Sequence, residues 1–529
     1  MRRPNETSAG VRNAASTIRS PTPGAGIDPV SAHDRGNQDE DFAMTDLDLC
    51  YMSAHEALRR YRDRSLSPVE AASAHLERLE AAEPKINAFM TQDHETARVE
   101  AWASEARWAK GEPLGPLDGV TVTIKDLIPQ MGRPLRNGSA TTDDSPCDID
   151  APTVARLREA GCVFLGKTTS PECGWKGITD GPLFGFTRNP WNLAHSPGGS
   201  SGGAAASLAA GIGHLALGND GGGSVRIPCS YSGLYGLKPT FGRVPDHPRE
   251  GIFCMTSTEG PMTRSVDDAA LMLNTLALPD ADDWYALPHD DRDWTTASEE
   301  GVRGLKVAYA PGLGRAVIDD EVRVLTDAAA QKFVELGAEV DDPGSVFEPL
   351  EEAMTAHWLA GFASILRAIP EERHDLLDPR FRTVAERGLA VTVPQLQASI
   401  VHRDRLGTLL NHFHQEWDLL LTPTLPTTAP LVDTPYHSQG LHRWNHATPF
   451  TVPFNLTGQP GASVPCGLTP GGLPVGLQIV AAKYREDLVM RASRAYESVH
   501  PQSWPNERVE AALAGDVPAA ADRYDEPVV

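Results

Sequence analysis

The chain has 529 residues, of which 40% are hydrophobic and 22% charged, a composition typical of a globular protein with a sizeable core. Its formal net charge of −24 repels nucleic-acid backbones and anionic membrane surfaces, and no basic patch or membrane-length apolar run opposes this. The seven cysteines include no C-x-x-C pair, which argues against a disulfide framework or a zinc site. We therefore expect a cytoplasmic protein without a nucleic-acid or membrane partner.

The two ends of the chain differ in composition from the rest. Residues 1–45 are rich in Ser, Pro, Gly, Asn and Asp and hold few bulky apolar residues, which predicts a disordered N-terminal extension. The last residues, 502–529, are polar and contain proline, which predicts a loosely held tail. One catalytic domain is expected between them, over residues 46–501.

Two helices are predicted at the start of this domain. Ser53 and Ser67 each precede a capping-box pattern, and Pro68 occupies the first helical position of the second helix. Apolar residues at helical spacing continue until Pro84, which we expect to end that helix.

Strand and helix signals then alternate along the chain. Residues 120–125 alternate strictly between apolar and polar, which predicts a half-buried strand with Lys125 at its end. Further helices are expected at 155–160 and 321–336, and further strands at 163–165, 419–421 and 477–480. This alternation indicates an α/β protein with a largely internal sheet.

The densest glycine cluster is Ser-Pro-Gly-Gly-Ser-Ser-Gly-Gly at 196–203. Such a loop permits close backbone approach and could hold a phosphate. A Walker-type loop, however, requires Gly-Lys-Ser/Thr, and here Ala204 follows Gly203. The nucleotide-binding interpretation is therefore disfavoured.

A second cluster, Asn-Asp-Gly-Gly-Gly-Ser, spans 219–224. Consecutive residues without bulk, ending at Ser224, can direct several backbone N–H groups to one point beside a hydroxyl, as an oxyanion hole requires. An ordinary turn between a strand and a loop would also account for this cluster taken alone.

The two clusters and Lys125 together resemble the amidase signature family. The motifs that carry the resemblance are Gly-Gly-Ser-Ser-Gly-Gly at 198–203, Asp-x-Gly-Gly-Ser at 220–224 and the Lys-Asp pair at 125–126, in the family's order and at its intervals. It extends from about Ser53 to Glu497 and includes the stretches 233–240, 454–460 and 473–480, which we expect to serve packing and pocket shape. The implied fold is α/β, with a central mixed β-sheet flanked by helices on both faces.

The resemblance also implies a catalytic role for each motif. Ser224 would attack the carbonyl carbon, Ser200 would relay its proton, and Lys125 would accept it; a cis peptide bond would precede the relay serine. The backbone N–H groups of Gly221, Gly222, Gly223 and Ser224 would form the oxyanion hole. Three further residues would support the loop: Asp220, Arg226 and, by hydrogen bonding, Ser201. No cofactor or metal is implied.

Elementary chemistry agrees with these roles. An alcohol is a poor nucleophile until a base takes its proton, and a lysine can be that base only when burial disfavours its charged form. We therefore expect Lys125 to lie in a dry site.

The sequence departs from the family pattern at positions outside the three catalytic ones. Asn219 stands where Thr or Ser is common and Gly221 where Thr is common; Cys229, Tyr231 and Gly461 replace Ala, Phe and Ala. These departures bear on substrate preference and leave the mechanism unchanged.

Other chemistry is less well supported by the sequence. His412 and His414 lack the spacing of a metal-binding His-Glu-x-x-His motif, and Cys173 has no evident base that would make it a nucleophile. A catalytically silent scaffold on the same fold is disfavoured because Lys125, Ser200 and Ser224 are all present.

Two classes of amide-cleaving protein remain within the resemblance. Subunits of tRNA-dependent amidotransferases usually carry Gln at the position of Ile227, so we favour a stand-alone amidase, monomeric or homodimeric, acting on a small linear amide. A cyclic or oligomeric nylon-type amide is an alternative substrate, because residues 188–192 and 218–220 resemble that subgroup. The walls of the substrate pocket are expected within 131–139, 170–185 and 340–450.

Overall fold

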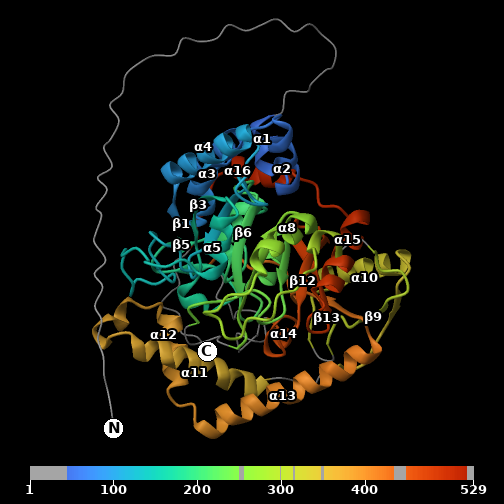
Figure 1. The fold of residues 1–529 in the computed structure, drawn as a ribbon. Coiled ribbons are helices and arrows are strands. Elements are labelled where there is room, and N and C mark those ends of the chain that lie inside the picture. Colours follow the sequence, from blue (N-terminus) through green and yellow to red (C-terminus); the bar gives the residue numbers. More distant parts are fainter. Residues whose placement is uncertain are drawn as a thin grey trace, which may run out of the picture. The chain divides into compact units, whose positions relative to one another are not determined.

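An eleven-stranded mixed sheet runs through the computed structural model, which describes residues 45–249, 255–297, 300–313, 316–346, 351–433 and 448–520 (Figure 1). Its strands lie in the order β1 (Phe89–Gln92), β3 (Val163–Thr168), β2 (Thr121–Lys125), β6 (Leu215–Asp220), β8 (Thr258–Thr263), β7 (Tyr235–Lys238), β12 (Gly461–Leu468), β13 (Pro474–Ala481), β11 (Leu419–Pro423), β9 (Lys306–Tyr309) and β10 (Glu339–Asp341). β2 is parallel to both β3 and β6, whereas β6, β8, β7, β12 and β13 form an antiparallel series. A separate two-stranded sheet joins β4 (Asp180–Gly181) to β5 (Gly185–Phe186).

Helices cover both faces of the large sheet, which confirms the expected fold class. α8 (Val266–Leu276), α10 (Asp320–Glu335) and α15 (Glu486–Val499) pack with the strands through one large apolar cluster. α6 (Gly202–Ala209) and α7 (Arg226–Ser232) contact strands β2, β3, β6, β7, β12 and β13. All eight residues of α6 are buried, which its small side chains allow.

The predicted strand at 120–125 is a strand, but it is not half-buried. Every residue of β2 is buried, because neighbouring strands flank it on both sides and α6 also contacts it. Thr121 uses its hydroxyl to hydrogen-bond His214, so this polar residue has a partner inside the protein. Lys125, at the end of the strand, is fully buried as well.

Most of the other predicted elements are confirmed. Ser53 and Ser67 are the N-caps of α2 (Ala54–Asp63) and α3 (Pro68–Ile86), and α5 (Pro152–Glu159), β3, α10, β11 and β13 lie where expected. The prediction that Pro84 ends the second helix is wrong by one short step, since α3 continues to Ile86. A proline in the last turn removes only one hydrogen bond from the ladder, which a long buried helix tolerates.

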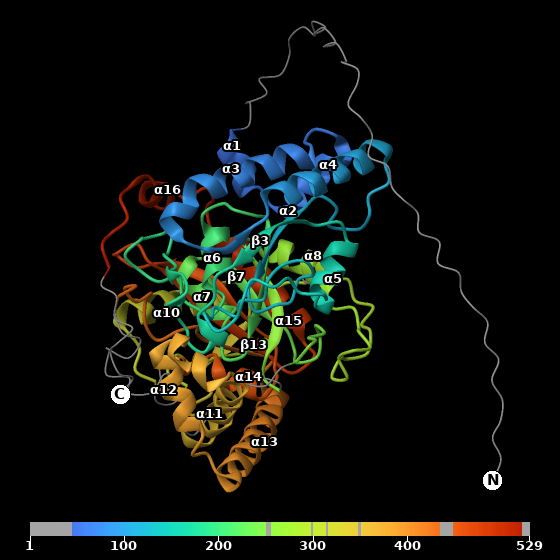
Figure 2. The same cartoon turned by 90° about the vertical axis from the view of Figure 1, so that its left-hand side faces the viewer.

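A layer of three helices between β10 and β11 was not predicted. It consists of α11 (Glu351–Ala368), α12 (Pro379–Gly388) and α13 (Val393–Glu416), drawn in yellow and orange along the lower edge of both views (Figures 1 and 2). α11 packs against both other helices. Trp358, Phe362 and Phe381 form the buried centre of this layer together with Trp175, which precedes the layer by far in sequence.

The segment at 504–514 packs more closely than the predicted tail. Trp504 stacks on Tyr51 of α1 (Asp46–Tyr51), with the ring centroids 5.5 Å apart. α16 (Glu507–Ala514) buries Val509 and Leu513 in a cluster shared with α3. Two apolar residues one turn apart are the only sequence signal for this short helix. The predicted extension at 1–45 lies outside the described residues except for its last residue, and so do residues 521–529.

The remaining elements are short or peripheral. They are α4 (His94–Lys110), α9 (Trp294–Ala297), α14 (Val452–Leu456) and the 3₁₀ turns η1 (Glu172–Gly174) and η3 (Glu371–Leu376). Of the helices in the described part of the chain, none combines the length and apolarity needed to cross a membrane.

Candidate active site

The three predicted catalytic residues follow or end elements at one edge of the sheet. Lys125 is the last residue of β2, and the neighbouring parallel strand β6 ends at Asp220, four residues before Ser224. Ser200 lies just before α6. Because the carboxyl ends of parallel strands meet at the same sheet edge, this topology brings segments distant in sequence together.

Lys125 lies in a dry site and contacts the relay serine directly. Its Nζ lies 2.6 Å from Ser200 Oγ, and the side chain is fully buried. Burial lowers the pKa of Lys125 to about 7, although the negative charges of Asp220, Asp126 and Glu259 partly oppose that shift. A large fraction of this lysine is therefore neutral near pH 7, as a base must be.

Asn219 is a second partner of the lysine, and the sequence did not identify this role. Its Oδ1 accepts a hydrogen bond of 2.6 Å from Lys125 Nζ. The departure from Thr or Ser at this position was the only signal that could have indicated it. The amide carbonyl holds one N–H of the lysine, so that the remaining valences of Nζ can face Ser200.

The backbone around Ser200 requires glycine. A cis peptide bond joins Gly199 to Ser200, as the resemblance implied. A Cβ on Gly199 would lie 2.7 Å from the backbone of Ile178, which leaves no room for a side chain. Ser200 itself is 2% exposed, so its hydroxyl is shielded from bulk water.

Ser224 is more accessible than either partner. It is half-buried, and among the described residues none forms a hydrogen bond with its hydroxyl. Ser201 supports it through the backbone: the Ser201 N–H donates to Ser224 O at 3.2 Å, and the Ser201 hydroxyl donates to Asn219 O at 3.3 Å. A buried base beside an accessible hydroxyl is the arrangement that a serine nucleophile needs.

The glycine loop before Ser224 presents fewer free N–H groups than expected. Gly223, with φ of +125°, donates its N–H to Asp220 Oδ1 at 2.6 Å, so that group is not available to an oxyanion. The N–H groups of Gly221, Gly222 and Ser224 form no hydrogen bond within the described part of the chain. These three remain the candidate donors to an oxyanion.

Asp220 and Arg226 brace the loop from beneath. Arg226 donates to both carboxylate oxygens of Asp220 at 2.9 Å, and both side chains are fully buried. The adjacent guanidinium holds the pKa of Asp220 below its usual range despite burial. The carboxylate also accepts the backbone N–H groups of Gly223 and Val225, which fixes the turn that carries Ser224.

Three residues of the C-terminal stretches extend this support. Arg226 donates to Asn455 Oδ1 at 2.6 Å and to Gln478 Oε1 at 2.7 Å. Thr451 donates its hydroxyl to Gly222 O at 2.7 Å. The sequence motifs flagged the stretches at 454–460 and 473–480 but assigned them to packing, because nothing in the sequence shows which polar residue reaches the loop.

A cavity of about 400 Å³ opens beside the catalytic lysine. Its walls include Leu127, Cys173, Asn219, Glu259, Ile365 and Ile369, and we call it the relay-side cavity. Its walls draw on each of the three segments predicted to form the pocket. Burial raises the pKa of the Cys173 thiol far above its usual range, so this residue is a poor candidate nucleophile.

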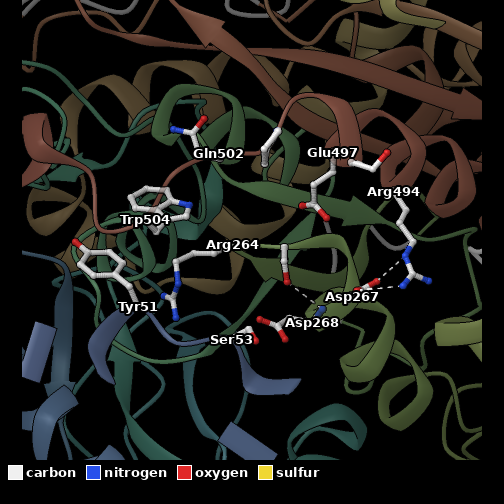
Figure 3. A pocket seen from close by; sticks show the side chains of 12 residues that line it. Tyr51, Ser53, Arg264, Asp267, Asp268, Arg494, Glu497, Gln502 and Trp504 are labelled. Atoms are coloured by element: carbon white, nitrogen blue, oxygen red, sulfur yellow. Dashed lines mark hydrogen bonds and ion pairs between the residues drawn. The ribbon is translucent and has the colours of Figure 1, made fainter. Parts of the chain in front are cut away.

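A second cavity, of about 430 Å³, has walls from other elements (Figure 3). It lies among Tyr51, Arg264, the start of α8, the end of α15 and Trp504, and none of its lining residues belongs to the loops of Ser200 and Ser224. Arg494 pairs with Asp267 at 3.1 Å, and Glu497 accepts the N–H of Val266 at the start of α8. These charged groups are thus engaged in holding helices together.

Comparison with known proteins places the chain among amide-cleaving enzymes. The family model described as Amidase matches residues 70–490. An acylamidase of Rhodococcus erythropolis is 38% identical over 464 residues, covering 87% of this chain and 97% of that protein. One of the subunits of the glutamyl-tRNA(Gln) amidotransferase of Moorella thermoacetica is 33% identical over 481 residues, covering 85% and 97%. The crystal structure of a bacterial aryl acylamidase of the amidase signature family superimposes with a TM-score of 0.80 at 32% identity, covering 88% and 99%.

Proposed function

The chain belongs to the amidase signature family and is an amidase, and from this premise we propose that it cleaves small carboxylic amides through an acyl-enzyme intermediate on Ser224. The observation that carries the proposal is the 2.6 Å contact between a fully buried Lys125 and Ser200 Oγ. A lysine whose pKa is lowered to about 7 is poised both to take and to return a proton near neutral pH.

The acylation step uses the three residues in sequence. Neutral Lys125 takes the proton of Ser200, Ser200 takes the proton of Ser224, and Ser224 Oγ forms a bond to the carbonyl carbon. The oxyanion that results is stabilised by the N–H groups of Gly221, Gly222 and Ser224. The relay then returns the proton to the amide nitrogen, the C–N bond breaks, and the amine leaves.

Deacylation repeats the relay with water in place of the first nucleophile. Water replaces the amine and loses its proton through Ser200 to Lys125, and its oxygen attacks the acyl carbon. Ser224 regains a proton as the ester bond breaks, so the enzyme returns to its starting state. No metal or cofactor takes part in either step.

The substrate is proposed to be a linear acylamide, hydrolysed without a partner protein or tRNA. Ile227 supports this choice because it is buried and packs with Tyr231, Leu425 and Ala429, so that an apolar side chain stands where amidotransferase subunits usually carry Gln. The acylamidase relative supports the same substrate class. A hydrolase of nylon-type amides and a glutaminase subunit are the alternatives, and we propose a monomer or homodimer in the cytoplasm.

A fluorophosphonate probe and an amide panel test this proposal together. The purified full chain should be labelled by the probe at Ser224, and it should hydrolyse simple aliphatic amides or acyl anilides with no added protein, RNA or metal. Hydrolysis of glutamine alone, appearing only with amidotransferase subunits, would support the glutaminase alternative. Absence of both labelling and turnover would favour a silent scaffold.

A further inference from the structure

The relay-side cavity lies on the side of the site where the amine must leave. The proton that the departing nitrogen needs comes from Ser200 and Lys125, so the nitrogen faces this pair as the C–N bond breaks. A Cβ placed on Gly174 would lie 3.1 Å from Ser200 Oγ and 3.0 Å from Leu127 Cδ2, which puts Leu127, a wall residue, close to the relay serine. Asn219, another wall residue, contacts Lys125.

The upper wall of the cavity is apolar. α11 contributes Ile365 and Ala368, Ile369 follows directly after it, and Leu127 and Leu135 come from the segment after β2. Such a surface accommodates a hydrocarbon segment and excludes water from it. The helical layer that sequence patterns did not predict therefore supplies part of the pocket.

The opposite wall carries two carboxyl groups. Glu259 pairs with Asn219 across strands β6 and β8, so it stands one strand away from the partner of Lys125. It is 3% exposed, and Thr153 donates a hydrogen bond to its Oε2. Within the described part of the chain Glu259 forms no ion pair, and Asp246 is the second carboxyl group in the wall.

The arginine in this wall does not balance these carboxyl groups. Arg249 pairs with Asp283 at 3.0 Å and with Asp246 at 3.3 Å. It therefore has two acidic partners besides any influence that it exerts on Glu259. Burial and the nearby Asp246 raise the pKa of Glu259 well above its usual range, which is the signature of a carboxyl group lacking a cation. A buried carboxylate is stabilised when an opposite charge is brought to it.

Building on the proposed function, we propose that the relay-side cavity binds the leaving amine and that it takes an alkyl amine with an ammonium group at its far end. The hydrocarbon segment lies against Ile365 and Ile369, and the ammonium group lies against Glu259 and Asp246. The preferred substrates are thus monoacylated diamines. Hydrolysis transfers the acyl group to water and releases the diamine, whose newly formed amino group gains its proton through Ser200.

Two substrates that share an acyl group test this preference. N-butanoyl-1,4-diaminobutane carries the ammonium group, and N-pentylbutanamide replaces it with a methyl group. The wild-type ratio of their kcat/KM values should favour the cationic amide by about tenfold to a hundredfold, as a hydrogen-bonded charge implies. In Glu259→Gln the ratio should fall toward one, whereas the exposed Glu112→Gln should keep it. Equal kcat/KM values in the wild type, or a preference kept by Glu259→Gln, would overturn the proposal.

Binding of the product amine supplies an independent measurement. Titration of Ser224→Ala with 1,4-diaminobutane by calorimetry should show binding that the additional change Glu259→Gln weakens by about tenfold. Butanoyl anilide separates the two proposals: failure to release aniline from it counts against the proposed amide hydrolysis, and the titration still decides the amine subsite. Unchanged binding in the double variant would refute the subsite.

Discussion

Arg226 holds Asp220 through two hydrogen bonds of 2.9 Å, and neither side chain reaches solvent. The same carboxylate accepts the backbone N–H groups that shape the nucleophile turn, so the ion pair links the stability of the core to the geometry of Ser224. A buried pair of this kind is costly to break, because removing one partner leaves the other charge uncompensated.

Replacing the arginine should therefore destabilise the protein strongly. Arg226→Met is expected to lower the free energy of unfolding by about 3–5 kcal/mol at pH 7, measured by urea denaturation. The lowered pKa of Asp220 means that its contribution is present above the unfolded-state pKa and is lost as pH falls, so the difference from wild type should shrink under acidic conditions. Arg382→Met, which removes an exposed pair with Glu386, should change stability by less than about 1 kcal/mol. Equal effects of the two substitutions would contradict the role given to the buried pair.

Removing the nucleophile should affect turnover and leave stability nearly unchanged. Ser224→Ala is expected to lower kcat by about 10⁴-fold or more on any accepted amide and to abolish fluorophosphonate labelling. Because its hydroxyl forms no hydrogen bond with a described residue, the free energy of unfolding should stay within about 1 kcal/mol of wild type. The exposed Ser65→Ala is the matched control and should alter neither quantity. Hydrolysis near the wild-type rate in Ser224→Ala would remove this serine from the mechanism.

Sequence patterns predicted much of the fold because local signals and burial agree there. The caps at Ser53 and Ser67 and the apolar runs that became β11 and β13 carry their signal within a few residues. The layer of α11, α12 and α13 escaped prediction because its apolar residues contact one another and Trp175, partners that no local window contains. The burial of both faces of β2 depends in the same way on α6, which lies far along the chain.

The candidate site was predictable where glycine and serine motifs constrain the backbone, and less so where distant side chains meet. Lys125 and Ser200 were paired by resemblance, and the structure brings them into contact. Asn219 and Thr451 were missed because their roles depend on where a side-chain oxygen points. Gly223 was expected to serve an oxyanion, but Asp220 takes its N–H, and nothing in the sequence distinguishes one glycine of the run from the next.

Asn219 should position the lysine base. Its Oδ1 stabilises the charged form of Lys125 by accepting a hydrogen bond, so its removal should lower the pKa of that lysine and move the acid limb of kcat/KM to lower pH. Asn219→Leu should also lower kcat by about tenfold to a hundredfold, because the amine loses its orientation toward Ser200. Asn219→Thr, the residue common in the family, should restore part of kcat. A lower kcat with an unmoved acid limb would indicate a purely structural role.

The ionisation of Lys125 itself should set the pH dependence of the enzyme. Burial lowers its pKa to about 7, and only the neutral amine can take the proton of Ser200, so kcat/KM should rise as pH increases through about 7 and then level off. Lys125→Ala should remove most of the rate together with this limb. Lys167→Ala is a suitable comparison, since Lys167 is also buried with a lowered pKa but donates to the backbone carbonyl of Ile128, away from the relay. If Lys125→Ala kept the same acid limb, another group would be the base, and the order of proton transfer from Ser224 through Ser200 would have to be reassigned.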